Sequence, residues 1–207
     1  MKSIVGYLLS FFLFGQASAH AQYLAPDALV RKTTDEIVSQ IKRDKSLVTD
    51  SNKLMQLVDT LVLPHFNFKR MTMLAVGRPW RDATPTQREQ LVQQFRTLLV
   101  RTYSTALGQY SDHTIDVKPT KLNAGDTRAT VRTQIQQPGG QPIPMDYRME
   151  KSADGWKVYD VSVEGVSIVT TYRSTFSNEV AKGGIDGLIK TLSEQNAIRE
   201  SRAATAK

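Results

Sequence analysis

Two hydrophobic periodicities divide this chain into three stretches. From residue 25 to about residue 110, apolar side chains recur every three or four positions, as at Leu91, Phe95, Leu98 and Leu99. This spacing is typical of one face of an α-helix, and it returns after Gly165. The pattern predicts helices over residues 25–50, 51–63, 66–76, 84–110, 166–182 and 185–201.

Between the helical stretches the period falls to two. Met145, Tyr147 and Met149, for example, alternate with proline or polar residues. Alternation indicates strands, because successive side chains of a strand point to opposite faces of the sheet. Turn sequences rich in Gly, Asn and Asp separate the runs. The pattern predicts four antiparallel strands, over residues 114–121, 126–137, 141–151 and 156–164.

The fourth predicted strand has an ambiguous parity. Trp156 and Val158 fall on one face, whereas Tyr159, Val161 and Val163 fall on the other, although all five are apolar. A β-bulge would bring the two sets together, because it inserts one extra residue into the strand.

Particular residues mark the ends of the predicted helices. Thr84 and Gln87 have the spacing of a capping box, and Ser51 and Ser167 are expected N-caps of the helices that follow them. The glycine pair 183–184 is expected to stop the helix before it.

The order of elements is helices, then strands, then helices again. This order favours a single α+β domain over residues 22–201, with helices packed on one face of a curved antiparallel sheet of four strands. Residues 202–207 are predicted to be a polar tail.

The first 21 residues have the pattern of a cleavable export signal. Lys2 precedes an apolar run over residues 4–14, and small residues follow at Ala17, Ala19 and Ala21. A membrane anchor is the weaker alternative, because the apolar run is shorter than the roughly 20 residues of a spanning helix. We therefore predict cleavage after Ala21, with Ala19 as second choice, and a periplasmic location.

Charge and cysteine content limit the classes of partner and of chemistry that the protein can have. The chain has 27 Lys and Arg against 20 Asp and Glu, a formal charge of +7, and the loss of Lys2 with the signal would leave +6. An excess of basic residues suits an anionic partner, and export argues against nucleic acid as that partner. The absence of cysteine excludes disulfides and thiol chemistry.

Catalytic and metal-binding signatures are not found in the sequence. It lacks a nucleophile elbow, a zinc-protease motif and a phosphate-binding loop, so no cofactor or metal is expected. Asp160 and Glu164 would lie about 13 Å apart along one strand, which is too far for a catalytic pair. We interpret Asp160 as a structural acceptor for a turn or a neighbouring arginine.

Methionine and tyrosine are frequent around the predicted sheet. Each can be ordinary core packing, but methionine also adapts its shape to flexible apolar guests. These residues are Met71, Met73, Met145, Met149, Tyr103, Tyr147, Tyr159 and Tyr172.

Three segments follow one another in a distinctive order. The first begins at Phe66-Asn67-Phe68 and continues through Met71, Leu74, Gly77, Trp80, Thr84 and Gln87. The second contains Leu98-Leu99 and Tyr103. The third and most specific covers residues 156–167, followed by Tyr172-Arg173 and Phe176. Together they resemble the MlaC family of periplasmic phospholipid-binding proteins, also described as toluene-tolerance proteins, although Asn67 departs from the family pattern, which usually has an acid there.

The resemblance implies a fold and a function. It implies an NTF2-like arrangement of helices over a strongly twisted sheet, with an apolar cavity between them that takes the acyl tails of a phospholipid. It implies transport of that lipid between an outer-membrane lipoprotein–porin complex and an inner-membrane ABC transporter with an MCE-domain subunit, which maintains outer-membrane lipid asymmetry. A monomer without catalytic activity is expected.

Inward strand positions and the facing helix stripes supply the candidate tail-contacting residues. They are Met71, Leu74, Phe95, Leu99, Tyr103, Val131, Ile135, Met145, Tyr147, Met149, Val161, Val163, Ile168 and Tyr172. Two other functions remain open: an NTF2-like cavity enzyme that uses a carboxylate such as Asp160, and a chaperone-like module that binds an exported polypeptide in an open groove.

Overall fold

A computed structural model describes residues 23–109, 114–137 and 139–205. The predicted signal peptide lies outside these residues. The helices are α1 (Pro26–Arg43), α2 (Ser46–Thr49), α3 (Ser51–Leu57), α4 (Phe68–Val76), α5 (Pro85–Gln109) and α6 (Ile168–Thr205). Short helical turns of other types are the π-helix η1 (Val58–Val62) and the 3-10 helices η2 (Leu63–His65) and η3 (Arg78–Arg81). The predicted polar tail is helical up to Thr205.

The sheet is an antiparallel meander in the order β1-β2-β3-β4-β5. Its strands are β1 (Thr114–Val117), β2 (Arg128–Gln136), β3 (Ile143–Ser152), β4 (Gly155–Val163) and β5 (Val166–Ser167). The sheet has one strand more than the four predicted, because the two residues of β5 fall at the start of the helix predicted over residues 166–182. Glu164 and Gly165 both adopt positive φ, which gives the tight turn that folds β5 back onto β4.

The predicted bulge is confirmed in β4. Arg148 of β3 pairs with Asp160, but the next residue, Met149, pairs with Val158, so that Tyr159 is the extra residue. The bulge places Val158 and Val161 in the same apolar cluster on one side of the sheet. Tyr159 packs instead against the helices on the other side of the strand.

Helix ends follow the predicted chemistry with two differences. The capping box is confirmed, because Thr84 and Gln87 exchange hydrogen bonds between side chain and backbone at 2.9 and 3.2 Å. Ser167 Oγ accepts from the Thr170 amide at 3.0 Å, as expected for the cap of α6. The cap of α3 is Asp50 rather than Ser51, since its carboxylate accepts from the amides of residues 52 and 53.

The start of α4 is the second difference. Phe66 pairs with Val158 of β4 instead of starting the helix, and the Asn67 amide donates to the Val158 carbonyl at 2.8 Å. The Asn67 side chain then caps α4 by accepting from the Arg70 amide. The expected stop at residues 183–184 is confirmed by the non-helical Gly184, which divides α6 into two arms.

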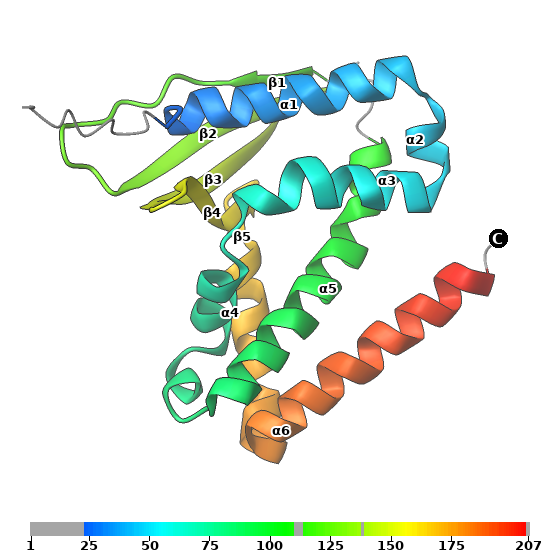
Figure 1. The fold of residues 1–207 in the computed structure, drawn as a ribbon, viewed down its shortest axis with the longest axis vertical. Helices are drawn as coiled ribbons and strands as arrows, with labels where there is room; N and C mark the ends of the chain where they lie inside the picture. The colour runs from blue at the N-terminus through cyan, green and yellow to red at the C-terminus, as the bar shows by residue number, and fades with distance from the viewer. Residues whose placement is uncertain (1–22, 110–113, 138, 206–207) are drawn as a thin grey trace, which may run out of the picture.

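Two groups of elements make up the molecule (Figure 1). α1 lies along β1 and β2, and it is tied to this layer by Arg31 Nη2, which donates to the Val117 carbonyl at 2.6 Å. α4, α5 and α6 pack on one another at the other end of the molecule, and α4 and α6 also contact β4. This architecture confirms the predicted α+β class. No helix among the described residues has the length and apolar content needed to cross a bilayer.

Each group has its own apolar core. The helical core consists of Met71, Ala75, Val76, Trp80, Leu91, Phe95, Leu98, Leu99, Val169, Phe176, Leu188 and Leu192. The sheet core consists of Val30, Val117, Val131, Met149, Trp156, Val158 and Val161.

Candidate functional site

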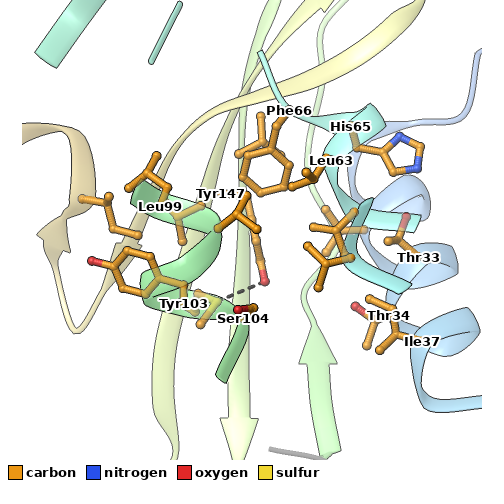
Figure 2. A pocket seen from close by; sticks show the side chains of 18 of the residues that line it. Thr33, Thr34, Ile37, Leu63, His65, Phe66, Leu99, Tyr103, Ser104 and Tyr147 are labelled. Carbon is orange, nitrogen blue, oxygen red and sulfur yellow. Dashed lines mark hydrogen bonds between the residues drawn. The ribbon is translucent and has the colours of Figure 1, made fainter. Parts of the chain in front are cut away.

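A cavity of about 280 Å³ lies between the sheet and the helices. Side chains from α1, from η1 and η2 after α3, from α4 and α5, from the start of α6 and from the sheet line it (Figure 2). The lining residues are Leu29, Val30, Thr33, Thr34, Ile37, Val38, Ile41, Val58, Val62, Leu63, His65, Phe66, Phe68, Met71, Leu99, Val100, Tyr103, Ser104, Ile115, Met145, Tyr147, Met149, Val158, Val161, Val163 and Ile168.

Local sequence explains why each wall faces inward. On α1 the apolar residues recur at helical spacing, so that one face of the helix lies over the sheet. On β3 the alternation turns Met145, Tyr147 and Met149 toward the cavity, and the bulge brings Val158 and Val161 of β4 to the same side. The result is a space enclosed by hydrocarbon on nearly every side.

Few polar side chains interrupt this surface. The Tyr147 hydroxyl donates to the Met145 Sδ at 3.0 Å, and burial raises the pKa of Tyr147 to about 12. Burial, together with the neighbouring Tyr172, also raises the pKa of Tyr103. Both hydroxyls therefore remain protonated at neutral pH. The remaining polar lining residues are Thr33, Thr34, His65 and Ser104.

His65 stands at the wall formed by η2, close to α1 (Figure 2). Burial is the main cause that lowers its pKa, and the ammonium groups of Lys157 and Lys32 lower it further, while Glu36 acts in the opposite direction. The imidazole is therefore neutral at neutral pH, and it adds no charge to the apolar wall.

Nine of the fourteen sequence-predicted residues lie in the cavity lining. They are Met71, Leu99, Tyr103, Met145, Tyr147, Met149, Val161, Val163 and Ile168. Their contact with an acyl tail stays a prediction.

Three of the other five, Leu74, Phe95 and Tyr172, lie outside the lining: Phe95 belongs to the helical core, and Leu74 and Tyr172 are partly buried against it. The Phe95 ring meets the Tyr172 and Phe176 rings at centroid distances of 5.1 and 5.0 Å. The stripe on α5 therefore serves two regions: Leu99 faces the cavity, whereas Phe95, one turn earlier, is sealed among aromatic rings.

Val131 and Ile135 also lie outside the lining, although they are on the predicted face of β2. Both are almost completely buried, at 0% and 2% exposure, so other side chains already cover them. The alternation identifies the face of a strand, but it does not show whether the facing side chain meets protein or open space.

The candidate residues chosen from sequence omitted two walls of the site, one from α1 and one from η1 and η2. The apolar stripe of α1 was visible in the helical period, but nothing local to it indicates that it lies across the cavity from β3 and β4. The wall from η1 and η2, with Val58, Val62 and Leu63, depends on a π-helical turn. Such a turn carries no clear sequence signature.

Asp160 is a structural acceptor, as expected, and it does not line the cavity. Its carboxylate, which is 3% exposed, accepts from the Ser167 hydroxyl at 2.7 Å and from the Val169 amide at 3.2 Å. Arg148 Nη1 lies 3.7 Å away. These bonds join β4 to the start of α6. Among the described residues, no group of three or more His, Cys, Asp or Glu side chains could hold a metal ion.

Fold and cavity together define an α+β protein with an internal apolar cavity. The family model described as "MlaC protein" matches residues 31–194, and the chain belongs to this family.

Comparisons with individual proteins agree with this family membership. The chain is 26% identical over 196 residues to the intermembrane phospholipid transport system binding protein MlaC of Haemophilus influenzae, covering 93% of this chain and 91% of that protein. It is 27% identical over 169 residues to the toluene tolerance protein ttg2D of Pseudomonas putida, covering 81% and 78%. The structure of a phospholipid-binding protein from Ralstonia solanacearum in complex with a phospholipid is similar, with a TM-score of 0.78 and 38% identity over 86% of this chain and 99% of that one.

Proposed function

We propose that this protein is a phospholipid carrier that holds acyl tails in the cavity between sheet and helices. The observation that supports this proposal most strongly is the cavity itself: an open, hydrocarbon-lined space in a fold shared with a protein solved in complex with a phospholipid.

Physical chemistry explains why such a space is needed. Each buried methylene contributes about 0.8 kcal/mol, so that moving one 16-carbon tail into water costs roughly 12 kcal/mol. Free phospholipid therefore does not cross an aqueous compartment at a useful rate. A carrier whose lining resembles the bilayer interior lowers this cost, and it leaves loading and release nearly balanced. Recognition then depends mainly on apolar volume, with little selection of head groups.

The setting of this transport is the periplasm. The export pattern of residues 1–21 supports that location, as does the intermembrane transport system named for the Haemophilus relative. The proposed exchange partners are an MCE-domain subunit of an inner-membrane ABC transporter and an outer-membrane lipoprotein–porin complex. The excess of basic residues would favour acidic faces on these partners, with contacts that weaken as salt rises.

We propose no catalytic step, and Asp160 provides the test of this view. In the Asp160→Asn variant, lipid binding should remain at the level of the unsubstituted protein, because the carboxylate lies outside the cavity lining. If the unsubstituted protein catalyses a reaction, and Asp160→Asn loses this activity while it still binds lipid, the cavity enzyme would be favoured instead.

Native mass spectrometry of the purified protein tests the proposed function. The expected spectrum shows one phospholipid per chain, and thin-layer chromatography of the extracted cargo identifies it as phospholipid. A protein that stays lipid-free after mild purification and takes up no lipid from vesicles would overturn the proposal. A co-purifying polypeptide would indicate the chaperone-like module.

A further inference from the structure

Tyr147 places a hydroxyl in the apolar cavity with only a weak partner. On β3 it pairs with Val131 of β2 and with Val161 of β4, so that its ring is held between two valines. Within the described residues, the hydrogen bond found for its hydroxyl is the one to the Met145 thioether at 3.0 Å. A thioether sulfur is a poor acceptor, and a buried hydroxyl normally finds a better one.

The neighbours of this hydroxyl come from α5. Ser104 of α5, itself buried, lines the same region of the cavity (Figure 2). The preceding residue, Tyr103, is 41% exposed and is the most exposed side chain of the lining. The wall that α5 provides therefore borders the surface at Tyr103, and the hydroxyls of Tyr147 and Ser104 lie on its cavity side.

The polar atoms of a phospholipid that lie next to its tails are the ester oxygens. Its tails are hydrocarbon, its phosphate belongs to the head group, and the ester carbonyls join the two. A carbonyl oxygen accepts a hydrogen bond far better than a thioether does. The flexible Met145 side chain can change rotamer and leave the hydroxyl free for such an acceptor.

We propose that the Tyr147 hydroxyl donates a hydrogen bond to an ester carbonyl of the bound lipid, which makes Tyr147 a specificity determinant for ester-linked over ether-linked lipids. This inference rests on the proposed function. The tyrosine pKa, raised to about 12, keeps the donor protonated throughout the physiological range.

The experiment compares two lipids with two variants. Affinities of the delipidated protein are measured for diacyl phosphatidylglycerol and for its dialkyl ether analogue of equal chain length, which lacks both carbonyls. In Tyr147→Phe the affinity for the diacyl lipid should fall about threefold to tenfold, the usual effect of one hydrogen bond, while the affinity for the ether lipid stays unchanged. Tyr159→Phe, which removes a tyrosine hydroxyl outside the cavity lining, should bind both lipids as the unsubstituted protein does.

Folding is checked in the same series. The empty Tyr147→Phe variant should melt at the same temperature as the unsubstituted protein or above it, because the substitution removes a buried hydroxyl that lacks a strong acceptor. Equal changes for both lipids, or no change for either, would overturn the inference while leaving the carrier function intact. Binding of neither lipid by the unsubstituted protein would overturn both.

Discussion

The two apolar cores of this protein differ in how completely they are filled. In the helical core, the rings of Phe95, Tyr172 and Phe176 lie at centroid distances of 5.0 to 5.7 Å, and Leu188 and Leu192 are buried in the same cluster. The sheet core has similarly apolar side chains, yet a cavity of about 280 Å³ separates its strands from the helices that cover them.

The difference lies in the elements that provide the cover. In the helical core, the break at Gly184 lets both arms of α6 contribute buried side chains, Phe176 from one arm and Leu188 from the other. The sheet is covered instead by α1 and by the chain from α3 to η2, which line the cavity opposite the strands. Hydrophobic composition therefore does not decide whether a core is filled or hollow. The distance between the covering helices and the layer beneath them does.

Substitution of two neighbouring leucines on α5 should give the largest difference between the filled helical core and the hollow sheet core. Leu98 is sealed in the helical core at 1% exposure, whereas Leu99, at 6%, also lines the cavity. Leu98→Ala should lower the free energy of unfolding by about 4 kcal/mol, because it creates a new void, and Leu99→Ala by about 2 kcal/mol, because its void joins existing space. Denaturant titration of the lipid-free protein measures both, and equal losses would mean that the cavity is not open.

Filling the cavity should remove binding without unfolding the protein. In Val163→Trp the indole would displace roughly four methylenes of a tail, so we expect the affinity for phospholipid to fall about a hundredfold. Thr130→Trp, at an exposed position on the opposite face of the sheet, is the control and should bind normally. Retained binding in Val163→Trp, measured by uptake from vesicles, would place the lipid elsewhere.

The buried Tyr147 hydroxyl should lower the free energy of unfolding of the protein at alkaline pH. The native pKa of about 12 exceeds the ordinary value near 10, so that the unfolded chain loses this proton first as the pH rises. Stability from this group is therefore complete below pH 10 and is lost between pH 10 and 12, by about 2 kcal/mol. Tyr147→Phe should lose correspondingly less over this window. Urea titration at each pH measures the free energy of unfolding. Identical dependence of this free energy on pH in the two proteins would show that the hydroxyl is not buried.

Much of the fold was predictable from sequence because its signals are local. The helical period of α5, the capping pair Thr84 and Gln87, and the glycine break in α6 each depend on neighbours within a few residues. The bulge in β4 was also predictable, since two apolar sets of opposite parity have to share one face. The two-residue β5 was missed because its strand character comes from pairing with β4 across the turn.

The candidate site was harder to predict than the fold. Phe95 and Leu99 share one stripe and one chemistry, yet only Leu99 lines the cavity. The separation depends on the aromatic side chains that α6 places against Phe95, which lie more than 70 residues further along the chain. Similarly, the part of α1 in the lining depends on its distance from the sheet, and no local pattern encodes that distance.

The two tryptophans of the chain test most directly whether a lipid tail lies between sheet and helices. Trp80 lies in the helical core and Trp156 in the sheet core. Fluorescence is measured in Trp80→Phe and in Trp156→Phe after loading with a phospholipid that carries bromine on its acyl tails. A tail held in the cavity should quench Trp156 strongly and Trp80 little. Equal quenching of both, or stronger quenching of Trp80, would contradict the claim that the lipid occupies the space between sheet and helices.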